Sequence, residues 1–118
     1  MKTQVNIATL QGRLGATPEI KVINENKSYA RVSIAVNDNY KNSSNEWVEN
    51  VHWFRLVFWN KKTELAKKFE KGNLVRVTGK LVTNTFTDKE GVINNVVELV
   101  VRSIESVDTN KENKEEEE

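Results

Sequence analysis

The feature that most limits how this chain can fold is a series of extended segments interrupted once by a helical pattern. The segments are rich in Val, Ile, Thr and aromatic residues, and clusters of Asn, Ser, Asp and Gly between them favour chain reversal. We predict strands at residues 4–14, 29–37, 47–59, 74–86 and 92–107. A short helix is predicted after Trp59, between a capping Asn60 and a terminating Gly72. Its apolar stripe consists of Leu65, Ala66 and Phe69.

This order of elements indicates a particular all-β architecture. Three strands, a helix and two further strands is the order of a five-stranded Greek-key barrel of the oligonucleotide-binding (OB) type, with its helix between strands three and four. A β-sandwich is the alternative. With only five strands, a barrel is the simpler way to remove exposed strand edges. We therefore predict an OB-fold barrel, with residues 19–23 as an irregular continuation of its first strand.

Length and composition exclude several classes of protein. The chain has 118 residues, about the size of one domain. With no cysteine and one histidine, it has no disulfide and no Cys/His zinc site, which suits a reducing compartment. The first ten residues lack the apolar run of a signal peptide, and no stretch approaches the roughly 20 apolar residues that cross a bilayer. We expect a soluble, cytoplasmic protein with no cofactor and no bound metal.

Charge divides the chain into two unlike regions. Residues 1–107 carry 16 Lys and Arg against 11 Asp and Glu, whereas residues 108–118 carry 2 against 6. The second region, DTNKENKEEEE, has no apolar residue that could offset its ordering entropy, so we expect a disordered acidic tail after a basic domain of residues 1–107. Such a tail is either a solubilising end or an interaction segment that competes with a polyanion for the basic domain.

The segment VHWFRLVFWN, residues 51–60, places aromatic side chains on both faces of the third predicted strand, because successive side chains point to opposite faces. The nearly apolar face is predicted to line the barrel interior and carries His52, Phe54, Leu56 and Phe58. The opposite face carries Val51, Trp53, Arg55, Val57 and Trp59. An arginine between two tryptophans suits a surface better than a core, because Arg is almost never fully buried unless it is paired.

Two kinds of surface fit this row of side chains. Every nucleic-acid base can stack on an indole ring, with about 1–3 kcal/mol per stacked base, and a guanidinium can contact phosphate. Aromatic residues and Arg are also enriched in homo-oligomer interfaces. The fourth strand repeats the pattern of outward cations before an aromatic, at Arg76, Thr78, Lys80, Val82, Asn84 and Phe86, and the second does so more weakly, at Tyr29, Arg31, Ser33 and Asn37. This repetition favours nucleic acid, and a purely structural oligomer remains the alternative.

Collinear landmarks show that the chain resembles the bacterial single-stranded DNA-binding proteins. They are LQGRLGATPEIK at 10–21, YARVSIAVNDNY at 29–40, HWFRLVFWNKKTELA at 52–66, KGNLVRVTGKL at 71–81 and FTDKEG at 86–91. The resemblance implies an OB barrel that assembles as a homotetramer and wraps single-stranded DNA without sequence readout during replication, recombination and repair. It implies base stacking by Tyr40, Trp53, Trp59 and Phe86, and phosphate contacts by Arg55, Lys61, Lys71 and Lys21. For Tyr40 it favours exposure, although strict alternation gives that residue core parity.

The chain also departs from this family's pattern. Asn84 and Thr85 stand before the last aromatic, where basic residues are frequent, and Phe54 replaces a histidine. The chain ends in EEEE without the apolar tip through which the family recruits replication and repair proteins, which argues against recruitment through this tail. Trp47, beside a turn, is predicted to serve packing rather than stacking.

Enzymatic interpretations find little support. His52 has no cysteine to pair with, and the carboxylates show no spacing that would converge on a cleft; these are Glu46, Glu49, Glu64 and Glu70. GRLG at 12–15 is too short for a phosphate-binding fingerprint. We therefore predict a binding protein without catalytic residues. The alternative function is that of a single-stranded RNA-binding or replication-restart accessory protein, because nothing in the sequence is devoted to sensing a 2′-hydroxyl.

Overall fold

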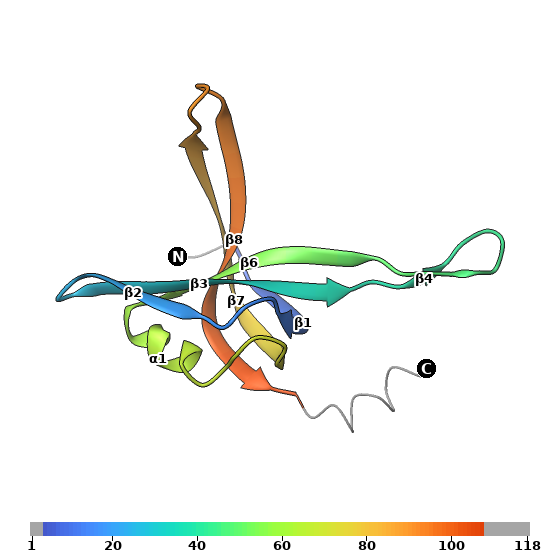
Figure 1. Cartoon of the computed structure of the whole chain (residues 1–118), viewed down its shortest axis with the longest axis horizontal. Coiled ribbons are helices and arrows are strands. Elements are labelled where there is room, and N and C mark those ends of the chain that lie inside the picture. The colour runs from blue at the N-terminus through green and yellow to red at the C-terminus, as the bar shows by residue number, and fades with distance from the viewer. Residues whose placement is uncertain (1–3, 108–118) are drawn as a thin grey trace.

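The computed structural model describes residues 4–107, so the expected acidic tail lies outside the described residues. These residues form a mostly β structure with one short helix (Figure 1). The elements are β1 (Ala8–Leu14), β2 (Glu19–Asn24), β3 (Lys27–Asn37), β4 (Tyr40–Lys41), β5 (Trp47–Val48), β6 (Val51–Trp59), the 3₁₀ turn η1 (Asn60–Lys62), α1 (Thr63–Ala66), β7 (Leu74–Thr87) and β8 (Ile93–Ser106).

The five predicted strands correspond to β1, β3, β6, β7 and β8. Together with β2 they form one six-stranded sheet in the order β1-β7-β8-β6-β3-β2, in which β6 and β8 are parallel and the other pairs antiparallel. β1 also pairs with β3 through Arg13↔Ala35 and Leu14↔Ile34, so the sheet curls around on itself. This strand order, together with the helix between β6 and β7, confirms the predicted OB architecture. Residues 19–23 were expected to be irregular, but they lie in β2, which pairs with β3.

Two glycines allow the strands to approach each other where the sheet bends. A Cβ atom on Gly12 would collide with the carbonyl oxygen of Ala35, at the point where β1 crosses β3. A Cβ atom on Gly79 would collide with the carbonyl oxygen of Val100, at the register shift between β7 and β8. Glycine is the residue expected at such bulges and close backbone approaches.

The core lies inside the curled sheet and against α1. Its largest fully buried side chains are Phe58, Ile34, Leu56, Leu99, Val75 and Val77. Ala66 and Phe69 are also buried in this core and Leu65 packs against it, which confirms the predicted apolar stripe. These contacts hold α1 against one end of the barrel.

The helix is shorter than predicted and does not begin with an asparagine cap. Asn60 has a positive φ of 51°, and its side-chain oxygen accepts a hydrogen bond from the Ser28 backbone N–H at 3.0 Å. Asn60 therefore ties η1 to β3 instead of capping α1. Gly72 has a φ of 88° in the turn after the helix, where a left-handed residue was expected.

Two two-stranded arms project from the barrel, one formed by β3 and β6 with β4 and β5 at its tip, the other by β7 and β8 (Figure 1). Side chains with interior parity are uncovered along these arms. Phe54 is 41% exposed and His52 is also exposed, so their prediction as core residues is wrong. Val57 has outward parity but is fully buried. Alternation thus identifies the face of a strand, whereas neighbouring elements decide whether that face is covered.

Candidate nucleic-acid interface

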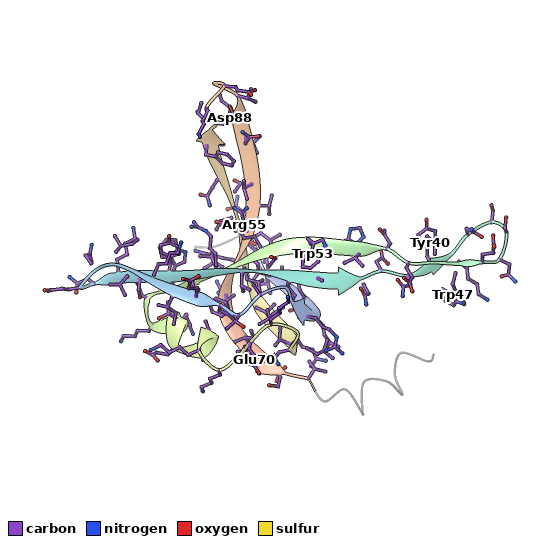
Figure 2. All side chains as sticks on the ribbon, in the orientation of Figure 1. Tyr40, Trp47, Trp53, Arg55, Glu70 and Asp88 are labelled. Carbon is purple, nitrogen blue, oxygen red and sulfur yellow. The ribbon has the colours of Figure 1, made fainter. Side chains whose placement is uncertain are left out.

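The outward face of the sheet brings residues from four strands into rows. Directly paired residues of neighbouring strands share a face. Read across β2, β3, β6 and β8, the rows are Lys21–Tyr29–Trp59, Glu19–Arg31–Val57–Val100, Ser33–Arg55–Glu98 and Ala35–Trp53. We call this surface, bounded by Trp53 at one end and Trp59 at the other, the indole face. Figure 2 shows Arg55 near the junction of the two arms and Trp53 further along the β3–β6 arm.

Trp53 offers its ring to solvent, as predicted. It is 61% exposed, and its Cζ3 atom would lie 2.7 Å from a Cβ atom built on Gly15, so Gly15 leaves room for the ring. Trp53 and Arg55 together line a hollow of about 380 Å³, whose other lining residues are Ser33, Phe54, Val96 and Val97. An indole and a guanidinium therefore share one concave surface.

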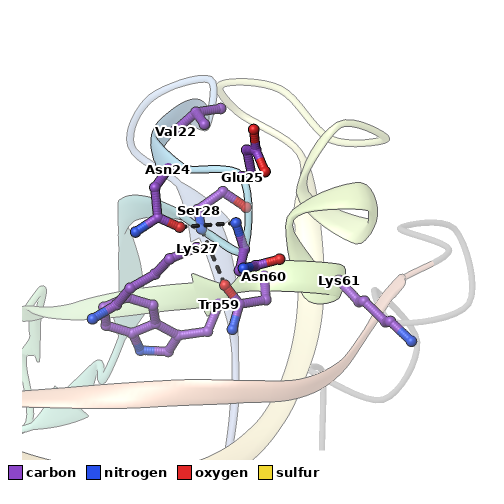
Figure 3. A pocket seen from close by; sticks show the side chains of 9 residues that line it. Val22, Asn24, Glu25, Lys27, Ser28, Trp59, Asn60 and Lys61 are labelled. Carbon is purple, nitrogen blue, oxygen red and sulfur yellow. Dashed lines mark hydrogen bonds between the residues drawn. The ribbon is translucent and has the colours of Figure 1, made fainter.

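Trp59 lies among other side chains and is only partly exposed. Its ring centroid is 5.7 Å from the ring centroid of Tyr29. The Lys27 ammonium lies 5.4 Å from the Trp59 ring centroid. Trp59 borders an open hollow of about 740 Å³ that it shares with Lys27, Asn60 and Lys61, among others. Figure 3 shows Lys27 running alongside the indole while Lys61 extends away from it.

A buried glutamate lies under the indole face, and the sequence analysis gave it no role. Glu98 is 3% exposed, and its Oε2 accepts a hydrogen bond from Arg31 Nε at 2.9 Å. The same oxygen lies 3.6 Å from Arg55 Nη1, and Oε1 accepts a hydrogen bond from Asn84 Nδ2 at 2.8 Å. The sequence did contain one sign of a buried carboxylate, which is the charged residue within the apolar run VVELVV at residues 96–101.

The arms carry the remaining aromatic candidates. Tyr40 is 50% exposed on β4 and Phe86 is 52% exposed on β7. Tyr40 escapes its core parity because β3 ends at Asn37, before β4 begins. Trp47 is 69% exposed, with the Lys41 ammonium 5.5 Å from its ring centroid. The residues that the structure describes leave most of Trp47 exposed, so the prediction that it serves packing is wrong.

The three candidate lysines lie at different edges of the barrel. Lys21 is exposed on β2, in the row that contains Trp59. Lys61 is exposed in η1, and Lys71 is exposed in the turn after α1, where its backbone N–H donates to Thr17 Oγ1 at 3.0 Å. The structure thus gathers Trp53, Arg55, Trp59 and Lys21 on one face, and places Tyr40, Phe86, Lys61 and Lys71 around it.

At the tip of the β7–β8 arm, Asp88 organises the turn. Its Oδ1 accepts hydrogen bonds from the backbone N–H groups of Glu90 and Val92, both at 2.9 Å. The hydrogen bond from the Val92 backbone lowers the pKa of the Asp88 carboxyl below its usual 3.8; desolvation opposes it, and hydrogen bonds from Asn94 and Glu90 lower the pKa further.

Within residues 4–107, no group of three or more His, Cys, Asp or Glu side chains is placed to hold a metal ion. Nor does this stretch contain a helix long and apolar enough to span a membrane.

Comparison with known proteins gives consistent matches along the chain. The sequence model of the Single-strand binding protein family matches residues 5–107. The chain is 34% identical over 91 residues to Single-stranded DNA-binding protein 1 of Nostoc sp. strain PCC 7120, covering 76% of this chain and 71% of that protein. It is 30% identical over 108 residues to Single-stranded DNA-binding protein 1 of Lactococcus lactis, covering 91% and 71%. The solved structure "Plasmodium falciparum SSB complex with ssDNA" has a TM-score of 0.81 at 25% identity, covering 92% of this chain and 99% of that one.

Proposed function

This chain belongs to the single-strand binding protein family, and we propose that it binds single-stranded DNA without reading its sequence. The observation that carries this proposal is the indole face, on which exposed Trp53 and Arg55 share a hollow and Trp59 lies further along the same strand. Indoles stack on any base, and a guanidinium holds a phosphate of any nucleotide. A site built from these groups is sequence-tolerant and sensitive to salt.

The single strand would run across the indole face and continue along the two arms. In this proposal Trp59 stacks a base on the barrel and Trp53 stacks one where the β3–β6 arm begins, while Tyr40 and Phe86 stack bases further out on the arms. Arg55 and Lys21 contact phosphates beside the indoles. Lys61 and Lys71 extend the basic path around the helix end of the barrel.

We also propose that residues 1–107 act as the binding domain of a homotetramer, with residues 108–118 as a separate acidic tail. Apolar side chains left exposed on the monomer support assembly, because contiguous exposed apolar surface marks interaction sites. They include Val5, Ile7, Phe54, Leu81 and Val97. The cellular role would be to protect unpaired DNA in the cytoplasm during replication, recombination and repair, without catalysis by this chain.

Tryptophan fluorescence tests DNA binding directly. Titration of the full chain with a dT oligonucleotide should quench its fluorescence, because bases stacked on Trp53 and Trp59 alter the indole environment. The Trp53→Ala, Trp59→Ala double variant should bind about 10-fold or more weakly, since each stacked base contributes about 1–3 kcal/mol. Its binding is measured with labelled oligonucleotide because two reporting indoles are gone.

The controls separate this function from its alternatives. Tyr29→Phe retains an aromatic ring beside Trp59 and should bind as the parent does. Competition between dT and rU oligonucleotides of equal length should favour DNA; preference for rU would support an RNA-binding protein. Equal affinity of the parent and the double variant would exclude the indole face as the site.

A further inference from the structure

The Glu98 cluster contains more positive than negative charge. Two guanidinium groups, from Arg31 and Arg55, approach one carboxylate, and the third partner, Asn84, is neutral. A buried carboxylate requires such partners, because an unpaired buried charge is strongly unfavourable. One arginine would neutralise it. The second leaves the Glu98 cluster with a net positive charge.

Both arginines remain open to solvent on the side away from Glu98. The Arg31 side chain is 42% exposed and the Arg55 side chain 51%, against 3% for Glu98. Arg31 uses its Nε to donate to the carboxylate, and its guanidinium carbon lies 4.9 Å from the Tyr29 ring centroid. A planar guanidinium fixed at Nε and over a ring directs its terminal nitrogens in a defined direction.

Arg31 also occupies the right place along the site. It lies on β3 next to the row that contains Tyr29 and Trp59, and one row from Arg55. Both arginines therefore stand between the indoles of Trp53 and Trp59. A nucleotide strand whose bases stack on Trp53 and Trp59 must carry its backbone past them.

On these observations we propose that Arg31 is a second phosphate-binding residue, and that Glu98 is a positioning residue that holds Arg31 and Arg55 side by side beneath one stretch of DNA backbone. This inference rests on the proposed function. The sequence analysis placed Arg31 on the outward face but gave it no role. A paired arginine can bind phosphate because its Nε and its terminal nitrogens face different partners.

Salt dependence of binding tests the role of Arg31. Each phosphate contact to a single strand contributes about 0.7 to the slope of log K against log salt. Arg31→Gln should reduce that slope by about 0.7 for a dT oligonucleotide and weaken binding several-fold at low salt. Arg102→Gln is the matched control, because Arg102 is an exposed arginine on β8 that belongs to none of the rows of the indole face. It should leave the slope unchanged.

A double-mutant cycle tests the role of Glu98. Arg31→Gln should weaken binding by a smaller factor in a Glu98→Gln background, because Arg31 is then no longer held in place. The Arg31→Gln, Glu98→Gln double variant buries no unpaired carboxylate, and its thermal unfolding confirms that it is folded. Its slope should be reduced at least as much as that of Arg31→Gln, because Arg55 also loses the carboxylate that positions it.

Three results would overturn the proposal. An unchanged slope in both Arg31 variants, while the Trp53, Trp59 double variant still loses affinity, would make Arg31 only an ion-pair partner. Equal losses on Arg31→Gln with and without Glu98 would remove the positioning role of Glu98. Absence of binding by the parent chain would refute the proposed function and this inference with it.

Discussion

Neighbouring side chains on one face of β6 differ widely in exposure. Trp53 is 61% exposed, whereas Val57, four residues further along the same face, is fully buried. Val57 pairs with Arg31 on one side and Val100 on the other, inside the sheet, while Trp53 lies on the arm where β8 is no longer its partner. Which β6 side chains can reach a ligand therefore depends on where the neighbouring strands stop covering them.

Residue-level stability should follow this difference in coverage. Phe58→Ala should cost about 3–5 kcal/mol, because Phe58 is fully buried in the core. Trp47→Ala should change stability by no more than about 0.5 kcal/mol, because Trp47 is mostly exposed. Urea unfolding followed by circular dichroism measures both. A cost of several kcal/mol for Trp47→Ala would show that its ring is buried against something in solution.

Sequence patterns predicted the positions of the long elements well, but not which of their side chains are buried. The strands and the outward Trp53–Arg55–Trp59 row follow from period-two alternation, which is a local property. The exposure of Phe54 and the burial of Val57 depend on which strands extend past the barrel, and that is decided by pairing between distant segments. Glu98 was missed because its partners come from β3, β6 and β7 and share no sequence spacing with it.

The β7–β8 turn should loosen in acid because its organising group titrates there. The pKa of Asp88 is lowered in the folded protein, so its stabilising hydrogen bonds are fully present above the usual value of 3.8 and are lost as pH falls through the lower folded value. Amide NMR signals of Glu90 and Val92 should shift with a midpoint below 3.8. Asp88→Asn should abolish that transition. A midpoint above 3.8 in the parent chain would contradict the assigned hydrogen bonds.

At the scale of the whole molecule, the arms give an elongated outline rather than a sphere, with extents of 52 × 37 × 36 Å (Figure 1). Their apolar side chains are only partly covered within the described chain; Phe54, Leu81 and Val97 are between 41% and 55% exposed. An isolated two-stranded ribbon is marginally stable in water. Arms of this kind are stabilised when they contact either a partner chain or DNA.

Assembly should therefore be measurable without DNA. Light scattering on a size-exclusion column should give a mass four times that of the chain at micromolar concentration. Phe54→Glu, Leu81→Glu should lower that mass, because it places charge on surfaces that assembly would bury. Lys80→Glu, an adjacent charge change on the opposite parity of β7, is the control. A parent mass equal to one chain would contradict the tetramer.

The pairing of β6 with β8 has a consequence for how the molecule forms. Arg55 pairs with Glu98 across these parallel strands, and Leu10 pairs with Val77 between β1 and β7. The barrel therefore depends on strand pairing between segments far apart in the chain. High contact order of this kind slows folding, because long loops must close before their contacts form. During synthesis, Glu98 emerges after both of the arginines that it anchors. A growing chain should therefore gain affinity for single strands abruptly, when β8 docks.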